Sequence, residues 1–277
     1  MGWHYIETGN HDLPTIVFLH GFMGSGRDWE AITSSLEDKY HCLAYDLPGH
    51  GTTDLMNIGK TLSVESTARA IAEDVKSRGL NKIIPVGYSL GGRIALAMSV
   101  LFPESVRALV LESANPGIED GHECAARAKL DDIKASELRK VGIARFLDKW
   151  YEQPLFSSLK RNPNLLAELK RSRTGSDPES LAQALSALSV GRQLSYWSKL
   201  EEVDIPVLLL TGRLDEKYRE IALRMKSKIP DSRWEVIDGA GHNTHLEKPD
   251  RFVGILKDFL ETLEEGRGSD SERKRHE

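Results

Sequence analysis

Short apolar runs recur along the chain, and each ends in a loop rich in glycine, proline or polar residues. The runs occupy residues 15–19, 41–45, 83–86, 106–111, 205–210 and 234–237, and a weaker one lies at 3–7. Runs that are apolar throughout, with β-branched residues, are typical of strands buried on both faces of a parallel sheet. Helical periodicity separates the runs, at 28–36, 64–79, 94–98, 219–228 and 249–263. The pattern therefore predicts a mainly parallel, doubly wound α/β sheet, which binds its ligand beyond the carboxyl ends of the strands.

The pattern changes between residues 118 and 199, where no convincing strand is found. Helical periodicity covers 123–135, 136–151, 164–173 and 178–189. We therefore expect an α/β core at 1–117 and 200–265, interrupted by a helical insertion at 118–199. Residues 266–277 are polar, charged and without periodicity, and are expected to form a disordered tail.

The run at 83–86 leads into Gly87-Tyr88-Ser89-Leu90-Gly91, a Gly-x-Ser-x-Gly pattern between a strand and a helix. The glycines permit a turn so tight that larger side chains would collide with neighbouring backbone. Ser89 would then project at the carboxyl end of a strand, where the free N–H of Leu90 can face developing negative charge. By itself the pattern also fits an ordinary glycine-rich turn.

Further polar residues stand just past other buried runs. Asp215 follows 205–210 and His242 follows 234–237, so the order along the chain is Ser, Asp, His, as in α/β-hydrolases. His20-Gly21-Phe22 follows an early strand, and a backbone N–H there could supply the other half of an oxyanion hole. Each residue alone could be an ordinary loop residue, but together the four features favour a catalytic site.

Composition indicates which kinds of molecule the protein is not expected to bind. The 277 residues include 40% hydrophobic and 29% charged residues, as expected of a globular protein, and the net charge of -5 gives no reason to expect nucleic acid binding. No apolar run is long enough to cross a membrane, and the first residues lack the basic start and apolar core of a signal peptide. Cys42 and Cys124 match no metal spacing and are interpreted as free thiols. A cytoplasmic protein is expected.

Four motifs together resemble the α/β-hydrolase superfamily, across residues 3–263. They are His20-Gly21-Phe22-Met23-Gly24, Asp46-Leu47-Pro48-Gly49-His50-Gly51, Gly87-Tyr88-Ser89-Leu90-Gly91-Gly92 and Gly241-His242. The resemblance implies an α/β-hydrolase fold in which 118–199 is a helical cap. It also implies a catalytic role for Ser89, Asp215 and His242, and an oxyanion hole formed by the backbone N–H groups of Phe22 and Leu90.

Arg93 stands one helical turn beyond Ser89, on the same helix face. An ester hydrolase has no general need for a guanidinium at this place, whereas a carboxylate substrate would explain it through a charge-assisted contact. Arg93 could equally pair with a structural acid, and its position in the sequence does not decide between the two.

Three features narrow the resemblance further: the elbow with Arg93, Trp150-Tyr151-Glu152-Gln153-Pro154, and Gly241-His242-Asn243-x-His245. Together they resemble the 2-succinyl-6-hydroxy-2,4-cyclohexadiene-1-carboxylate synthase family of menaquinone biosynthesis. The resemblance implies elimination of pyruvate from 2-succinyl-5-enolpyruvyl-6-hydroxy-3-cyclohexene-1-carboxylate, with no metal or organic cofactor. Ser89 would act as a base that removes a proton from the succinyl arm next to its ketone, and the oxyanion hole would hold the enolate.

The same resemblance implies which residues meet this small anionic substrate. The substrate-binding set is Tyr88, Arg93, Arg127, Trp150, Tyr151, Phe156 and Arg171, with Arg173 as the alternative to Arg171. The aromatic members could also be core residues of the cap. Two other functions stay open, a carboxylesterase or C–C bond hydrolase with Ser89 as nucleophile, and a non-catalytic binding protein on a hydrolase scaffold. We expect a monomer without nucleic acid or membrane partners.

Overall fold

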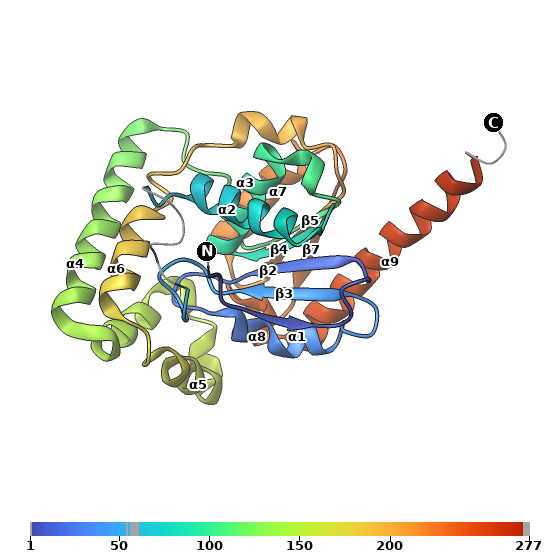
Figure 1. The fold of residues 1–277 in the computed structure, drawn as a ribbon. Helices are drawn as coiled ribbons and strands as arrows, with labels where there is room; N and C mark the ends of the chain where they lie inside the picture. Colours follow the sequence, from blue (N-terminus) through green and yellow to red (C-terminus); the bar gives the residue numbers. More distant parts are fainter. Residues whose placement is uncertain (1, 54, 56–60, 274–277) are drawn as a thin grey trace.

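A computed structural model describes residues 2–53, 55 and 61–273, with the backbone alone described for 266–273 (Figure 1). Within this part of the chain, seven strands form one sheet in the order β1-β3-β2-β4-β5-β6-β7. The strands are β1 (Tyr5–Thr8), β2 (Thr15–Leu19), β3 (His41–Tyr45), β4 (Ile84–Tyr88), β5 (Leu109–Glu112), β6 (Val207–Gly212) and β7 (Ser232–Ile237). Edge strand β1 is antiparallel to β3, and all the other pairs are parallel.

Helices cover both faces of the sheet, because successive residues of the central strands point to opposite sides. Ile16 and Phe18 of β2 belong to one apolar core, whereas Val17 and Leu19 belong to the other. Figure 1 shows α2, α3 and α7 on one face and α1, α8 and α9 on the other. These helices are α1 (Glu30–Ser34), α2 (Val64–Ser77), α3 (Leu90–Leu101), α7 (Glu216–Lys226), α8 (Thr244–Glu247) and α9 (Pro249–Arg273). The predicted doubly wound α/β fold is confirmed.

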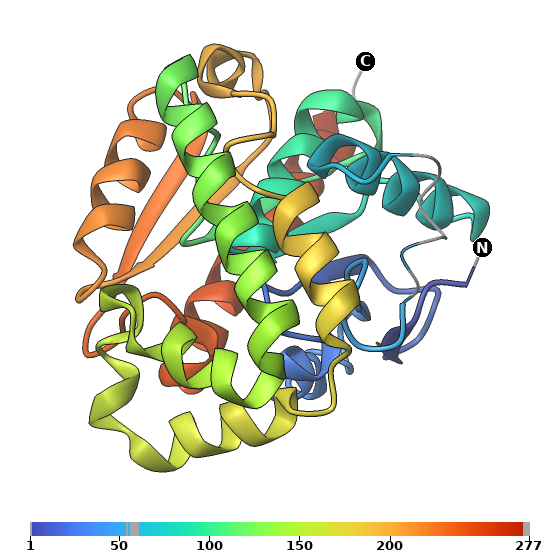
Figure 2. The same ribbon diagram turned by 90° about the vertical axis from the view of Figure 1, so that its left-hand side faces the viewer.

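Three helices between β5 and β6 lie beyond one end of the sheet, as Figures 1 and 2 show together: α4 (Gly121–Glu152), α5 (Pro163–Arg173) and α6 (Pro178–Ala187). We call this group the cap. The sequence predicted a helix break after Ala135, but α4 continues through that residue. The break lies at Gly142, where φ is +74° and ψ is 170°. Glycine adopts this backbone conformation far more readily than other residues do.

The last helix corrects the prediction of a disordered tail from residue 266. Helix α9 continues to Arg273, and only the predicted tail residues 274–277 lie outside the described part of the chain. A polar segment without periodicity resembles a disordered tail in sequence, but it can also extend an existing helix at little cost, because nucleation is not repeated. Among the described residues, no helix is both long enough and apolar enough to cross a membrane.

Candidate active site

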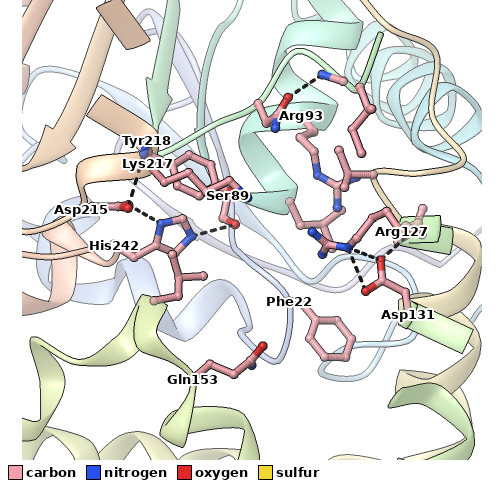
Figure 3. Close-up of a pocket in the computed structure, with 18 of the residues that line it drawn as sticks. Phe22, Ser89, Arg93, Arg127, Asp131, Gln153, Asp215, Lys217, Tyr218 and His242 are labelled. Atoms are coloured by element: carbon pink, nitrogen blue, oxygen red, sulfur yellow. Dashed lines mark hydrogen bonds and ion pairs between the residues drawn. The ribbon is translucent and has the colours of Figure 1, made fainter. Parts of the chain in front are cut away.

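Ser89, His242 and Asp215 meet at the carboxyl end of the sheet, in the loops after β4, β7 and β6 (Figure 3). The His242 Nε2 atom lies 3.1 Å from Ser89 Oγ, and His242 Nδ1 lies 2.6 Å from Asp215 Oδ2. The other carboxylate oxygen of Asp215 accepts the backbone N–H of Tyr218 at 3.4 Å, within the first turn of α7. His242 and Asp215 are both buried. This arrangement can activate a serine, with a histidine base that a carboxylate orients.

The turn that carries Ser89 is strained and tightly packed. Ser89 has φ +50° and ψ −104°, a conformation that a non-glycine residue adopts only when its surroundings impose it. A Cβ atom added to Gly91 would lie 2.0 Å from the backbone oxygen of Leu19, and the Gly91 N–H donates to the His20 oxygen at 3.0 Å. The start of α3 is therefore fixed against the loop that follows β2.

That contact joins the two segments that carry the expected oxyanion donors. Phe22 lies in the loop after β2, and Leu90 is the first residue of α3, where the N–H has no acceptor within the helix. Both residues line the same cavity as Ser89. The structure thus places both segments beside the serine, and their role as donors stays a prediction.

A cavity of about 920 Å³ lies between the strand ends and the cap. Ser89, Asp215 and His242 line its core side. Five of the predicted substrate-binding residues also line it: Tyr88, Arg93, Arg127, Trp150 and Phe156. A volume of this size suits a small organic ligand.

Arg93 is held by an amide and not by an acid. Its Nη1 donates to Gln193 Oε1 at 2.7 Å. Among the described residues, no carboxylate lies within ion-pair distance of the Arg93 guanidinium. The alternative that Arg93 pairs with a structural acid is therefore not supported by these residues. Burial lowers the pKa of Arg93 to about 10, so that the guanidinium stays positive near neutral pH.

Helix α4 adds two further cations to the cavity wall. Arg127 Nε donates to both carboxylate oxygens of Asp131, at 3.1 and 3.0 Å, and Asp131 also accepts the Ser189 hydroxyl at 2.6 Å. Lys134 Nζ donates to Gln153 Oε1 at 3.0 Å, and burial lowers the pKa of Lys134. Sequence reasoning missed Lys134. Its spacing of seven residues from Arg127, two turns along one helix face, was the available signal.

Three of the predicted substrate contacts lie elsewhere. Arg171 is exposed on α5, and Arg173 is buried with its Nη2 2.8 Å from Asp28 Oδ2. Tyr151 packs edge-on against Phe156, with ring centroids 5.2 Å apart, in the apolar core of the cap. None of the three is among the described residues that line the cavity. Residues two positions apart on a helix point in different directions, so Arg171 and Arg173 have different surroundings. Neither side chain points into the cavity.

A buried hydrogen bond between a histidine and a carboxylate supports the loop that carries His242. His245 Nδ1 lies 2.7 Å from Glu112 Oε2, and Glu112 Oε1 accepts the Thr244 hydroxyl at 2.7 Å. Glu112 ends β5, and its backbone oxygen accepts the Ser89 N–H at 2.9 Å. The residue thus links the serine turn to the histidine loop. In the described part of the chain, no group of three His, Cys, Asp or Glu side chains is placed to hold a metal ion.

Comparison with known proteins places this geometry in a family. The model of the alpha/beta hydrolase family matches residues 16–255. The 2-succinyl-6-hydroxy-2,4-cyclohexadiene-1-carboxylate synthase of Serratia proteamaculans (strain 568) is 30% identical over 257 residues, which are 92% of this chain and 96% of that protein. A Bacillus subtilis (strain 168) protein, provisionally named for the same synthase, is 35% identical over 258 residues, 93% of this chain and 94% of that one.

Solved structures agree with these matches. The structure of MenH from S. aureus has a TM-score of 0.89 to this one at 31% sequence identity, and covers 94% of this chain and 99% of that chain. The family match spans well over half of the chain, and it includes Ser89, Asp215 and His242. This chain therefore belongs to the alpha/beta hydrolase family.

Proposed function

We propose that this chain is a 2-succinyl-6-hydroxy-2,4-cyclohexadiene-1-carboxylate synthase, which eliminates pyruvate from 2-succinyl-5-enolpyruvyl-6-hydroxy-3-cyclohexene-1-carboxylate. The observation that carries the proposal is the pairing of a Ser–His–Asp arrangement with cavity cations that have no carboxylate partner among the described residues, namely Arg93 and Lys134. A substrate with several carboxylates would supply the missing partners. The names of the relatives support the same reaction.

The two compound names define the bonds that change. The substrate has a ring double bond at carbon 3, and the product has double bonds at carbons 2 and 4, so the lost proton sits on ring carbon 2. This carbon is next to the succinyl ketone, which corrects the expectation of a proton taken from the arm itself. The C–H electrons form the new bond between carbons 2 and 3. The former double bond shifts to carbons 4 and 5, the C–O bond at carbon 5 breaks, and the enolate of pyruvate leaves and gains a proton.

In this reaction Ser89 serves as a base. His242 Nε2, 3.1 Å from Ser89 Oγ, accepts the hydroxyl proton while Ser89 takes the proton from carbon 2. Asp215 stabilises the imidazolium that forms, through its 2.6 Å contact with His242 Nδ1. Negative charge moves onto the ketone oxygen, where the backbone N–H groups of Phe22 and Leu90 stabilise the enolate. No bond between serine and substrate is required.

The cavity cations bind and orient the substrate. Arg93 and Arg127 each present a guanidinium to the cavity, and such groups bind carboxylates with directional, charge-assisted hydrogen bonds. Trp150 and Phe156 form apolar wall against which a ring can lie. We propose that the protein works as a monomer in the cytoplasm.

The test is to incubate the purified protein with the proposed substrate and to follow pyruvate with lactate dehydrogenase and NADH. We expect the wild type to release pyruvate, and Ser89→Ala to lower kcat by at least about 1,000-fold, because the base is removed. Ser136→Ala, an exposed cap position outside the cavity, is the matched control. Turnover of p-nitrophenyl esters with no pyruvate from the pathway substrate would contradict the proposal and favour an esterase.

A further inference from the structure

Two of the cations that line the cavity, Arg93 and Lys134, are held differently from several basic side chains elsewhere in the cap and from Arg127, which pairs with Asp131. Outside the cavity, those side chains pair with acids: Arg139 with Glu179, Lys149 with Glu137, Lys170 with Asp148, Arg173 with Asp28 and Arg192 with Asp132. Inside it, Arg93 and Lys134 donate to the side-chain oxygens of Gln193 and Gln153. The cavity thus contains two cations that neutral amides orient.

An amide oxygen fixes the direction of a cation without compensating its charge. Lys134 is partly buried, and its Nζ lies 5.4 Å from the centroid of the Trp150 ring, so that water surrounds it incompletely. Asp131, which precedes Lys134 by three residues in the same helix, already accepts hydrogen bonds from Arg127 and Ser189. A desolvated cation without a counter-charge is costly to hold, and an anionic ligand would remove that cost.

The amide that orients Lys134 lies on the other side of Ser89 from Arg93. In Figure 3, Arg93 and Gln153 stand on opposite sides of Ser89, and Lys134 Nζ is 3.0 Å from Gln153 Oε1. Two cations placed in this way can bind the two ends of one ligand, with its reacting carbon held between them beside the serine.

We propose that Lys134 is a specificity-determining residue that binds a substrate carboxylate distinct from the carboxylate bound by Arg93. The proposal rests on the proposed function and deepens it. In this proposal Lys134 has the carboxylate-binding role that was expected of Arg171. Arg171 is exposed on α5. The residues favour a ligand with at least two carboxylates at separate ends, and disfavour a monocarboxylate ester.

The test compares Lys134→Gln with the matched variant Lys129→Gln, which removes the same charge from an exposed position of the same helix. For Lys134→Gln we expect KM for the pathway substrate to rise about tenfold or more, with kcat changed by less than about threefold, since a binding contact is lost and the base is not. Lys134→Arg should restore most of the loss. Lys129→Gln should match the wild type, and thermal unfolding shows whether each variant is folded.

Calorimetric titration with the reaction product adds a measurement that does not depend on turnover. The product keeps the ring and succinyl carboxylates and lacks the one that leaves with pyruvate. Weaker product binding by Lys134→Gln supports the proposal and assigns Lys134 to a retained carboxylate. A higher KM with unchanged product binding supports it and assigns Lys134 to the leaving carboxylate. Unchanged KM and unchanged product binding in a folded variant would overturn it. Absence of pyruvate release by the wild type would instead overturn the proposed function.

Discussion

The two walls of the active-site cavity differ in how firmly their residues are positioned. On the core wall, Ser89, Asp215 and His242 each follow a strand of the parallel sheet, and the register of that sheet fixes where each loop begins. On the cap wall, Arg127 and Lys134 project from α4, a helix that packs on α6 and breaks at Gly142. In the proposed function, the sheet would provide the precise placement that bond-breaking chemistry needs, and the cap would provide charges that select the substrate.

A matched pair of glycine substitutions provides the strongest test of this difference. In Gly91→Ala the new Cβ would lie 2.0 Å from the Leu19 backbone oxygen, and neither backbone can move without displacing Ser89. In Gly142→Ala the new Cβ atom would have no other atom within 4 Å, so the only cost comes from the positive φ. We expect Gly91→Ala to lower the free energy of unfolding by at least about 4 kcal/mol, and Gly142→Ala by about 2 kcal/mol. Denaturant titration measures both.

Pyruvate release adds a second readout for the same pair. A folded Gly91→Ala protein should have lost most of its activity, since the serine turn has shifted, whereas Gly142→Ala should keep the wild-type kcat. Similar losses of stability in the two variants would mean that the core wall is no more constrained than the cap wall.

The same difference explains which parts could be predicted from sequence. The strands and the serine turn were recognisable because burial on both faces produces apolar runs, and tight backbone contacts require glycine. Asp215 and His242 followed, since residues after parallel strands must meet at one edge. On the cap, periodicity indicates which face of a helix is apolar but not what that face meets. Tyr151 therefore proved to be a core residue, Arg171 proved to be exposed, and Lys134 was missed.

The buried ion pair between Arg173 and Asp28 joins the cap to the core. Arg173 belongs to α5 of the cap, and Asp28 lies in the short 3-10 helix Gly26–Trp29, between β2 and α1 of the core, with 2.8 Å between Nη2 and Oδ2. Removal of one partner leaves a buried charge unpaired, so we expect Arg173→Met to lower the free energy of unfolding by about 3 kcal/mol. Arg171→Met, at the exposed neighbour, should change it by less than about 0.5 kcal/mol. Urea titration of both variants is the measurement.

The double variant Asp28→Leu with Arg173→Met distinguishes a lost ion pair from lost packing. With both charges gone, part of the stability lost in Arg173→Met should return, because no charge is left uncompensated. If the second substitution lowered the free energy of unfolding by as much again as Arg173→Met alone, the pair would not couple the cap to the core.

Removal of the Arg93 guanidinium should affect substrate binding more than chemistry. Arg93 belongs to the core helix α3 but is oriented by Gln193 of the segment that returns from the cap, at 2.7 Å. We expect Arg93→Met to raise KM about 100-fold with kcat changed by less than about fivefold, since a charge-assisted contact is lost. Gln193→Leu should raise KM only a few-fold, because the guanidinium remains but is less well oriented. A fall in kcat without a change in KM would instead place Arg93 in the chemical step.

Acid should destabilise the core wall through His20 and His50, which are buried beneath the cap. Burial lowers the pKa of His20 to about 4 and that of His50 to about 3. His20 Nε2 accepts the Leu47 N–H at 2.9 Å, so protonation there would also break a hydrogen bond. Below the ordinary histidine pKa of about 6.5, the unfolded chain binds protons that the folded chain does not, so stability falls as pH falls.

Between pH 7 and pH 6, the two histidines together should lower the free energy of unfolding by about 1.4 kcal/mol. His50→Gln should remove about half of the contribution that these two histidines make to the slope of this free energy against pH, and His122→Gln, at an exposed position in the cap, is the control. The slope is the informative quantity, because His50→Gln also alters packing at every pH. An equal change of slope in both variants would show that acid sensitivity is not confined to the core wall.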